Sequence, residues 1–420
     1  MASARAPGAT IWIINHYAIS PDLPGGTRHF ELAKELVRRG HNVRVFACDI
    51  NLSLRQHTKL SDGALRCDQS YDGVDFTWVN AAAYTKNNWR RTWNMLSFAM
   101  NVVRIGLSVG ESPDCIVGSS PHPFAALAAW VLARAKRARF VLELRDLWPQ
   151  ALVDMGIPES SPSVRAMRVL EKFLYQAAQS IVILAAGSRQ YLAVRGIDSR
   201  KVAFIPNGVH LGDFDSRTDV SREELRAKYG FTGFTVVYTG AHGAANSLGT
   251  VLDAAPKLKQ VGDLQIVLIG DGPEKEWLVS RAQEQELSNV RFLDPVPKGE
   301  IPDVLRAADG ALITLRDVKA FSYGISPNKL FDYMAARKPI ICAVSGDIGA
   351  LVRESGCGFS VAPEQPGLLA DALIALANLP EEDIRRMGAC GRRVVEESYD
   401  RRQLACLLEQ VCLGQVPQNE

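Results

Sequence analysis

Residues Phe321 to Pro339 of the chain, FSYGISPNKLFDYMAARKP, combine a polar loop with the start of an amphipathic helix. A helix N-terminus presents unpaired N–H groups and the positive end of its dipole, which together favour a phosphate group. Lys329 adds a mobile cation, and Asp332 adds an acceptor suited to a ribose hydroxyl. The stretch is therefore a candidate site for a nucleotide sugar, although Ser326 and Pro327 also fit the cap and first turn of an ordinary helix.

A second glycine-rich loop, Pro24 to Gly26, strengthens this interpretation. It follows the first predicted strand and precedes a helix, in the other half of the chain. His16 lies between that strand and the loop, where it is a candidate acid–base residue or a structural histidine.

Length and composition predict a protein with two domains. The chain has 420 residues, of which 47% are hydrophobic and 22% are charged, a balance typical of globular proteins. A net charge of +2 gives no global field that would favour nucleic acid.

The cysteines and the N-terminus predict a cytoplasmic protein. No C-x-x-C spacing occurs among the eight cysteines, which are expected to be buried thiols in a reducing compartment. Residues 1–10 lack the features of a secretory signal, and no apolar run reaches the roughly 18 residues needed to span a bilayer.

Short apolar strands alternate with helical segments along both halves of the chain, which predicts an α/β fold. In the first half the expected strands are 11–15, 43–47, 115–117, 140–144, 180–184 and 202–205. In the second half they are 235–238, 264–269, 290–293, 310–314, 339–343 and 358–361. The pattern predicts two doubly wound parallel sheets, with a linker near residues 208–221 and with ligand-binding loops facing an interdomain cleft.

Five motifs make the chain resemble retaining glycosyltransferases of family 4, which have the GT-B fold of two Rossmann-like domains. They are Gly25-Gly26, RGHNVRVF (39–46), IPNGV (205–209), IGDGPEKEWL (269–278) and SPNKLFDYMAARKP (326–339). ELRDLWPQALVDMGI (143–157) together with SPNKLF is similar to the bacterial fucosaminyltransferase-like branch of O-antigen, capsule and colanic-acid synthesis.

The resemblance implies an acceptor domain at 1–210, a linker at 211–221, a nucleotide-sugar domain at 222–395 and a C-terminal helix at 396–420 that returns to the first domain. Lys329 is expected at the diphosphate, Asp332 at the ribose and the Val296-Pro297 backbone near the base. The further expected donor-binding residues are Gly25, Gly26, His242, Gly243, Gly270, Asp271, Gly272, Ser326, Pro327 and Asn328.

The sequence departs from the family pattern at three places. Gly324 and Asp332 stand where the family has two glutamates, which removes the first carboxylate. Residues Thr239 to Gly243 stand where the family has a basic pair that contacts the diphosphate. The negative charge of the diphosphate must therefore be neutralised by Lys329, by backbone N–H groups or by an arginine such as Arg316. Arg145-Asp146 replaces a His-Asp pair, which exchanges a titratable group for a permanent cation.

The expected catalytic residues are Asp146, Arg145 and His16, placed beside the reacting centre. The resemblance implies retention, with the departing phosphate taking the acceptor proton, so that no protein base is required. Asp213-Phe214-Asp215 has the spacing of a metal-binding D-x-D motif, but it follows IPNGV in the expected linker. We therefore expect no metal and no cofactor.

Residues 84–108, YTKNNWRRTWNMLSFAMNVVRIGLS, resemble an interfacial helix, although a core helix with a charged face has the same composition. The expected membrane or acceptor contacts are Trp89, Arg90, Arg91, Trp93 and Phe98. The branch implies a protein held peripherally on the inner face of the bacterial inner membrane.

The expected activity is transfer of an N-acetylated (deoxy)amino sugar from a UDP-sugar to an undecaprenyl-diphosphate-linked saccharide. Alternatives are a UDP-sugar 2-epimerase of GT-B fold and a non-catalytic nucleotide-sugar-binding scaffold. A nicotinamide-dependent oxidoreductase is disfavoured because no G-x-G-x-x-G follows the first strand.

Overall fold

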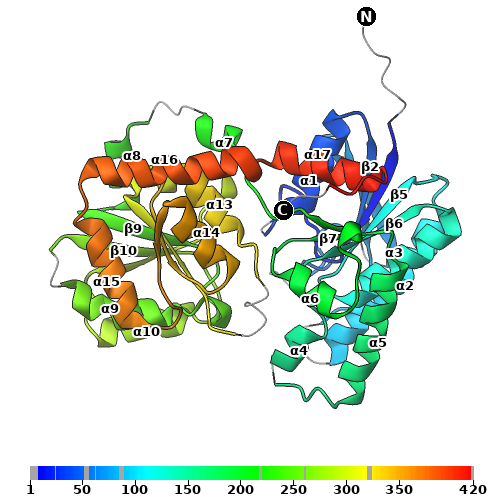
Figure 1. The fold of residues 1–420 in the computed structure, drawn as a ribbon, viewed down its shortest axis with the longest axis horizontal. Helices are drawn as coiled ribbons and strands as arrows, with labels where there is room; N and C mark the ends of the chain where they lie inside the picture. The colour runs from blue at the N-terminus through cyan, green and yellow to red at the C-terminus, as the bar shows by residue number, and fades with distance from the viewer. Residues whose placement is uncertain are drawn as a thin grey trace, which may run out of the picture. The chain divides into compact units, whose positions relative to one another are not determined.

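The computed structural model describes residues 8–23, 25–51, 56–61, 63–84, 89–154, 156–216, 220–259, 262–318 and 324–417. The chain forms two compact units, Met1–Pro206 with Arg401–Glu420, and Asn207–Asp400. Each unit has its own sheet (Figure 1). Parts of several sequence predictions lie outside the described residues, at 1–7, 24, 85–88, 155, 217–219, 321–323 and 418–420.

The first unit contains an eight-stranded sheet in the order β3-β4-β2-β1-β5-β6-β7-β8. Its strands are β1 (Thr10–Ile14), β2 (Asn42–Cys48), β3 (Arg66–Tyr71), β4 (Val74–Val79), β5 (Cys115–Ser119), β6 (Arg139–Leu144), β7 (Ser180–Ile183) and β8 (Val202–Phe204). All six expected strands are present. The expectation of a wholly parallel sheet is wrong at one edge, where β3 pairs antiparallel with β4. β3 is polar and has no buried residue, so it lacks the apolar signal of a strand.

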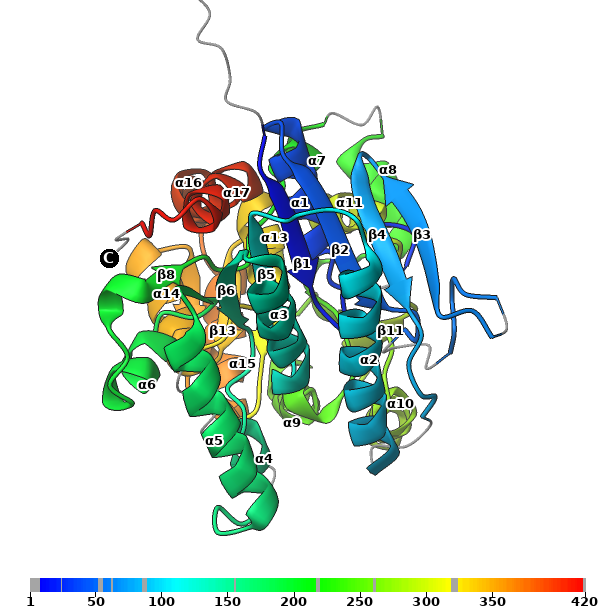
Figure 2. The same ribbon diagram turned by 90° about the vertical axis from the view of Figure 1, so that its right-hand side faces the viewer.

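Helices cover both faces of this sheet. They are α1 (Arg28–Arg38), α2 (Trp89–Ser108), α3 (Pro123–Lys136), α4 (Gln150–Asp154), α5 (Pro162–Ala177), α6 (Ser188–Val194) and α17 (Arg401–Cys412), with a 3-10 turn at Ser199–Lys201. α1 and α17 pack together, and both contribute to one core cluster against the sheet. On the other face α2, α3 and α5 lie side by side (Figure 2).

The second unit contains a six-stranded sheet in the order β11-β10-β9-β12-β13-β14, parallel throughout. Its strands are β9 (Phe234–Thr239), β10 (Leu264–Ile269), β11 (Val290–Leu293), β12 (Gly310–Thr314), β13 (Ile340–Ala343) and β14 (Gly358–Ser360). Every strand expected in this half is present, because buried parallel strands are short apolar runs that the sequence displays directly.

Two core clusters cover the faces of the second sheet. The helices are α7 (Gly212–Asp215), α8 (Arg222–Tyr229), α9 (Gly249–Leu258), α10 (Lys275–Glu284), α11 (Ile301–Ala307), α13 (Asn328–Ala335), α14 (Asp347–Ser355), α15 (Pro366–Ala377) and α16 (Glu381–Ser398), with 3-10 turns at Ala244–Asn246 and Lys298–Glu300. α8, α11, α13, α14 and α16 pack on one face, and α9, α10 and α15 pack on the other.

The strand order locates the candidate sites. In the first sheet β1 lies between β2 and β5, and in the second β9 lies between β10 and β12. Each is a point where the chain reverses its direction of progress across the sheet. Loops at the carboxyl ends of strands separate at such points and leave a crevice for a ligand.

Candidate active site

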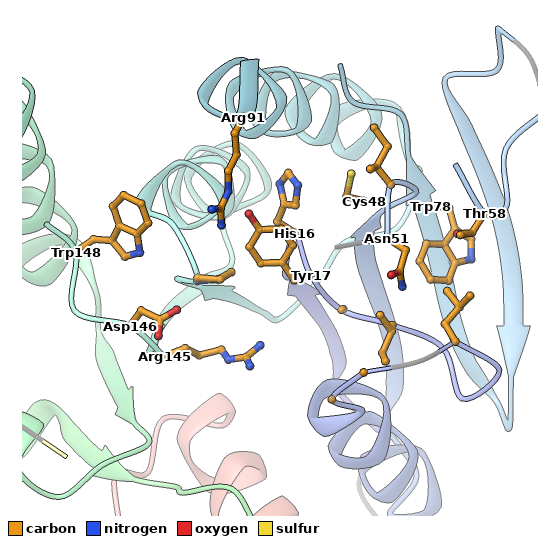
Figure 3. A pocket seen from close by; sticks show the side chains of 17 residues that line it. His16, Tyr17, Cys48, Asn51, Thr58, Trp78, Arg91, Arg145, Asp146 and Trp148 are labelled. Carbon is orange, nitrogen blue, oxygen red and sulfur yellow. The ribbon is translucent and has the colours of Figure 1, made fainter. Parts of the chain in front are cut away.

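A pocket of about 350 Å³ lies at the carboxyl ends of β1, β2, β5 and β6 in the first unit (Figure 3). It is lined by His16, Tyr17, Ala18, Ile19, Leu23, Gly25, Gly26, Cys48, Ile50, Asn51, Thr58, Trp78, Arg91, Pro121, Arg145, Asp146 and Trp148. All three expected catalytic residues and both glycines of the first loop therefore surround one cavity.

His16 is 1% exposed and packs against three rings. The centroid of its ring lies 4.4 Å from that of Phe98, 4.8 Å from that of His122 and 4.5 Å from that of Tyr17. Burial lowers the pKa of His16 to about 3, so the imidazole is neutral and able to accept a proton weakly. Its Nδ1 has no hydrogen-bond partner among the described residues.

Asp146 and Arg145 follow β6 and line the pocket side by side (Figure 3). Asp146 is accessible to solvent, yet the surrounding protein raises the pKa of its carboxyl, with Arg145 and Arg91 opposing the rise. A carboxylate with a raised pKa beside two cations suits the orientation of an acceptor hydroxyl or the acceptance of its proton.

A buried charged group supports the strands behind this pocket. Glu143 accepts hydrogen bonds from Arg28 Nε at 3.0 Å and from His29 Nε2 at 2.6 Å, which hold its pKa well below the usual range although burial acts in the opposite direction. Asn15 contacts the other nitrogen of His29 at 2.8 Å. The first turn of α1 is thus fixed to β6, which positions Gly25 and Gly26 at the rim.

The second candidate site lies in the second unit around Lys329. Its Nζ lies 3.9 Å from the centroid of the Tyr238 ring and 3.4 Å from Asn246 Oδ1. A Cβ on Gly240 would lie 2.9 Å from the same nitrogen. α13 therefore brings its lysine to the carboxyl end of β9, and burial lowers the pKa of the ammonium to about 7.

The loop after β10 passes so close to the loop after β9 that glycine is required at two positions. Gly270 has φ +149°, and a Cβ there would lie 1.9 Å from the carbonyl oxygen of Gly240. Gly272 has φ +157°, and a Cβ there would lie 2.4 Å from the carbonyl oxygen of His242. A Cβ cannot be accommodated at such distances, so only glycine allows these two loops to pass each other so closely.

Two buried polar groups near this end of the sheet have no hydrogen-bond partner among the described residues. Neither nitrogen of His242 has one, and its pKa is lowered to about 4, chiefly by burial and then by Lys275. Asn328 Oδ1, in the first turn of α13, is the other. Unsatisfied buried polar atoms are rare in folded proteins and are expected where a ligand supplies the missing partner.

The remaining expected donor residues lie at three places. Ser326 is not the cap of α13, because Pro327 occupies that position and Ser326 binds Asn207 instead. Asp332 lies on α13 beyond Lys329 and is half-buried. The others lie on the loops after β9, β10 and β11, namely Gly243, Asp271, Val296 and Pro297. Arg316, the alternative cation, is paired with Glu364 at 3.8 Å.

The structure corrects the interpretation of α2. Phe98 was expected to contact membrane or acceptor, but it is fully buried, because Met95, Phe98, Val102 and Ile105 form the face that packs on the domain. Trp89 and Trp93 are 71% and 50% exposed, and Arg90 is exposed. Arg91 reaches into the pocket (Figure 3). In the part of the chain that the structure describes, no helix is long and apolar enough to cross a membrane.

The D-x-D motif is engaged in protein contacts. Asp213 lies 3.1 Å from His210 Nδ1, and Asp215 lies 2.7 Å from Arg392. Among the described residues no group of three histidines, cysteines or carboxylates could hold a metal ion.

Several residues at the two sites were missed by sequence reasoning. Tyr17, Trp78, His122 and Trp148 surround the first, and Tyr238 lies under Lys329 in the second. Tyr17 and Trp148 lie close in the sequence to residues that were predicted, namely His16 and Asp146. Trp78 lies on β4, a strand that was not predicted, so its place in the pocket lining could not be expected.

The two units match two models of glycosyltransferase domains. Residues 25–208 match the glycosyl transferase 4-like domain, and residues 233–378 match glycosyl transferases group 1. The chain therefore carries two glycosyltransferase domains, the first within residues 25–208 and the second within residues 233–378.

Curated relatives and solved structures agree with this assignment. The chain is 26% identical to the probable glycosyltransferase WbjE of Pseudomonas aeruginosa, over 68% of this chain and 70% of that one. It is 24% identical to the putative colanic acid biosynthesis glycosyl transferase WcaI of Escherichia coli, over 53% and 55%. The chain thus spans about half the length of WcaI.

The fold is that of known GT-B enzymes, as expected. Sucrose-phosphate synthase from Thermosynechococcus elongatus superimposes with a TM-score of 0.74 at 16% identity, covering 96% of this chain and 98% of that one. HepE of Anabaena, solved with UDP, gives 0.67 at 16%, with the same coverage. WaaG, a glycosyltransferase involved in lipopolysaccharide biosynthesis, gives 0.68 at 14%, covering 96% and 100%.

Proposed function

We propose that the protein is a retaining family 4 glycosyltransferase of the fucosaminyltransferase-like branch. It moves an N-acetylated (deoxy)amino sugar from a UDP-sugar to an undecaprenyl-diphosphate-linked saccharide during O-antigen, capsule or exopolysaccharide synthesis. The relationship to WbjE and WcaI supports the pathway class, and the complexes of HepE with UDP and UDP-glucose support a uridine nucleotide donor.

The arrangement around Lys329 is the observation that carries this proposal. A lysine ammonium over Tyr238 and beside Gly240 has lost much of its hydration, and it has no carboxylate in a salt bridge with it among the described residues. A diphosphate would supply the missing negative charge and raise the pKa of the lysine. The N-terminus of α13 and the N–H groups of the glycine loops add to the attraction.

The reaction breaks the bond between the sugar C1 and the phosphate oxygen and forms a bond from C1 to the acceptor oxygen. Negative charge then develops on the departing diphosphate, so Lys329 and the adjacent N–H donors stabilise the transition state more than the ground state. The acceptor proton passes to the departing phosphate oxygen, with Asp146 and His16 orienting the hydroxyl. The chain needs no metal for these steps because Lys329 supplies the cation.

The pocket of the first unit is assigned to the acceptor saccharide, since aromatic walls and polar groups suit a sugar ring. Trp89, Arg90 and Trp93 are assigned to the surface of the inner membrane, where the lipid carrier lies. Exposed tryptophan next to arginine suits the headgroup region of an anionic bilayer. The protein is then peripheral on the cytoplasmic side.

Calorimetric titration with UDP, GDP and NAD, without added metal, tests the donor assignment. We expect UDP to bind, and to bind at least tenfold more weakly to Lys329→Ala. Preference for GDP would change the donor class, and absence of any nucleotide binding would contradict the proposal. An assay for sugar products without acceptor separates transfer from epimerisation, because a 2-epimerase would turn over under that condition.

A further inference from the structure

A buried carboxylate holds one wall of the pocket in the first unit. Asp49 directly follows β2 and is fully buried. Its Oδ1 accepts hydrogen bonds from three successive backbone N–H groups, those of residues 58–60, at 3.1, 2.6 and 3.2 Å. Its Oδ2 accepts a hydrogen bond from His57 Nδ1 at 2.7 Å. Asp49 thus fixes residues 57–60, the Thr58 segment, beside the end of β2.

The Thr58 segment is also tied to the loop after β1. Lys59 Nζ forms an ion pair with Asp22, which directly precedes Leu23, a residue of the pocket lining. The same ammonium lies 5.9 Å from the centroid of the Trp78 ring, which lines the pocket as well. Two loops that follow different strands are therefore joined where they border the cavity.

The wall formed by the Thr58 segment lies away from the expected catalytic residues. Thr58 and Trp78 lie at the opposite end of the pocket from Asp146 and Trp148 (Figure 3). In the proposed reaction the acceptor hydroxyl is oriented beside Asp146. The part of the acceptor that meets Thr58 is therefore not the part that reacts, so contacts there decide which saccharide binds.

The hydroxyl of Thr58 can offer a ligand only a hydrogen-bond acceptor. Its Oγ1 lies 3.0 Å from the carbonyl oxygen of Asp49 and 3.5 Å from Asp49 Oδ1. Both of these oxygens only accept, so the hydroxyl proton of Thr58 is directed to Asp49 and the lone pairs remain. A sugar hydroxyl or an acetamido N–H can donate to such an oxygen. A carboxylate or phosphate oxygen cannot.

We propose that the Thr58 segment recognises the acceptor saccharide, with Thr58 Oγ1 accepting a hydrogen bond from a hydroxyl or an amide N–H of the sugar. This inference rests on the proposed function, in which the pocket of the first unit takes the acceptor. Trp78 supplies an aromatic face beside this contact, as is common in sugar-binding pockets. Asp49 and Lys59 are positioning residues, because they act on the saccharide through the place of Thr58.

NMR of the full-length protein with labelled threonine methyl groups tests the contact. The probes are methyl β-glucoside and methyl N-acetyl-β-glucosaminide, and the signal of Thr58 is identified by its absence from Thr58→Ser. We expect at least one of the two sugars to shift this signal in a saturable way. A sugar that binds without moving the signal of Thr58, or the absence of binding by both sugars, would overturn the inference.

Thr58→Val tests the role of the oxygen, since valine keeps the shape of the side chain and removes the hydroxyl. The affinity for the sugar should fall by about fivefold to tenfold, the usual effect of losing one hydrogen bond. Thr58→Ser should retain the affinity. Thr92→Val, at an exposed position of α2, is the matched control and should behave like the unmodified protein. Equal affinity in Thr58→Val and Thr92→Val would contradict the proposed contact.

The positioning role is tested at the ion pair, because removal of the buried Asp49 carboxylate endangers folding. Lys59→Met and Asp22→Asn should each lower the affinity for the sugar by about threefold to fivefold. The double variant should lose no more than either single variant, since both remove the same contact. Thermal melting shows that each variant is folded. A lowered melting temperature with unchanged sugar affinity would show that the ion pair is structural only.

Titration of the same variants with UDP separates this inference from the proposed function. Thr58→Val and Lys59→Met should bind UDP normally, because Thr58 and Lys329 lie in different units. If UDP binds and Thr58→Val leaves the sugar affinity unchanged, only the inference about Thr58 fails. If a sugar binds at Thr58 but UDP does not bind, the proposed donor fails while the saccharide site remains.

Discussion

Asn207 donates two hydrogen bonds to Ser326, from its backbone N–H to Oγ at 2.8 Å and from its side-chain amide to the carbonyl oxygen at 2.5 Å. Ser326 directly precedes Pro327, the N-cap of α13, so Asn207 fixes the approach of the chain to the helix that carries Lys329. On the preceding residue, the carbonyl oxygen of Pro206 accepts a hydrogen bond from Arg28 at 2.5 Å. The peptide where the chain leaves the first unit is thus anchored on both sides.

Asn207→Ala should weaken donor binding without unfolding the protein. A typical hydrogen bond contributes about 1 kcal/mol, so losing the side-chain contact should reduce the affinity for UDP by about fivefold to tenfold. Ser326→Ala removes the other contact and should have a smaller or similar effect. Calorimetry with UDP measures both. Unchanged affinity in the double variant would show that the contact does not position α13.

Donor affinity should depend on pH through Lys329. The pKa of its ammonium is about 7 in the free protein because of burial, and a bound diphosphate raises it. The complex therefore needs the protonated lysine. As the pH rises above 7, affinity for UDP should fall by up to about tenfold per pH unit, until the pKa of the complex is reached.

Lys329→Arg provides the control, because a guanidinium stays charged throughout this range. It should bind UDP with little pH dependence, though with altered geometry.

Lys329→Ala should reduce kcat/KM by about 100- to 1,000-fold, the usual effect of removing one preorganised donor. His16 and His242, with pKa values near 3 and 4, should add no inflection between pH 6 and 7. A pH-independent affinity in the unmodified protein would contradict this role for the lysine.

Gly270→Ala should disrupt the loops beside Lys329. The added methyl group would lie 1.9 Å from the carbonyl oxygen of Gly240, so one of the two loops must move. We expect UDP binding to fall at least tenfold, with destabilisation of about 1–3 kcal/mol. Gly367→Ala is the matched control, since a Cβ at Gly367 meets no atom within 4 Å. Thermal melting measures the stability of the two variants, and calorimetry measures their affinity for UDP. Equal stability and equal affinity in both variants would contradict the packing argument.

The exposed and buried residues of α2 should behave differently. Trp89→Ala with Trp93→Ala should weaken binding to vesicles that contain anionic lipid by about tenfold or more, with little loss of stability. Phe98→Ala should destabilise the fold by about 3–5 kcal/mol, because its ring is fully buried. Vesicle sedimentation and chemical denaturation measure the two effects. If the double tryptophan variant bound vesicles as tightly as the unmodified protein, the proposed membrane contact of Trp89 and Trp93 would be contradicted.

The fold could be predicted from the sequence because its parallel strands are apolar runs bounded by turns and helices. β10, β11 and β12 have the expected bounds, for example. β3 could not be found in this way, since none of its residues is buried and its pairing with β4 is the only sign of a strand.

A residue of the candidate sites could be predicted where it belongs to a sequence motif. It could not be predicted where its position depends on contacts with residues far away in the sequence. Lys329 and Gly270 come from motifs, and the structure brings them to the same end of one sheet. Phe98 and Arg91 were grouped together because both occur in a segment rich in tryptophan and arginine. Phe98 lies on the buried face of α2, three residues after Met95 and four before Val102, whereas Arg91 lines the pocket. Ser326 contacts Asn207, which is 119 positions away, so the sequence around Ser326 gives no indication of this contact.

The chain passes between the two units twice, after Pro206 and after Asp400, and the segments next to these points are bridged where Val209 N–H donates to the carbonyl oxygen of Tyr399 at 3.0 Å. A domain held by one flexible strand of chain can twist about it freely. A domain held by two neighbouring segments resists twisting, so bending is its easiest motion. Proteolytic cleavage at either segment alone would cut the chain into two fragments, and the packing of α17 on α1 would then hold them together without a covalent link.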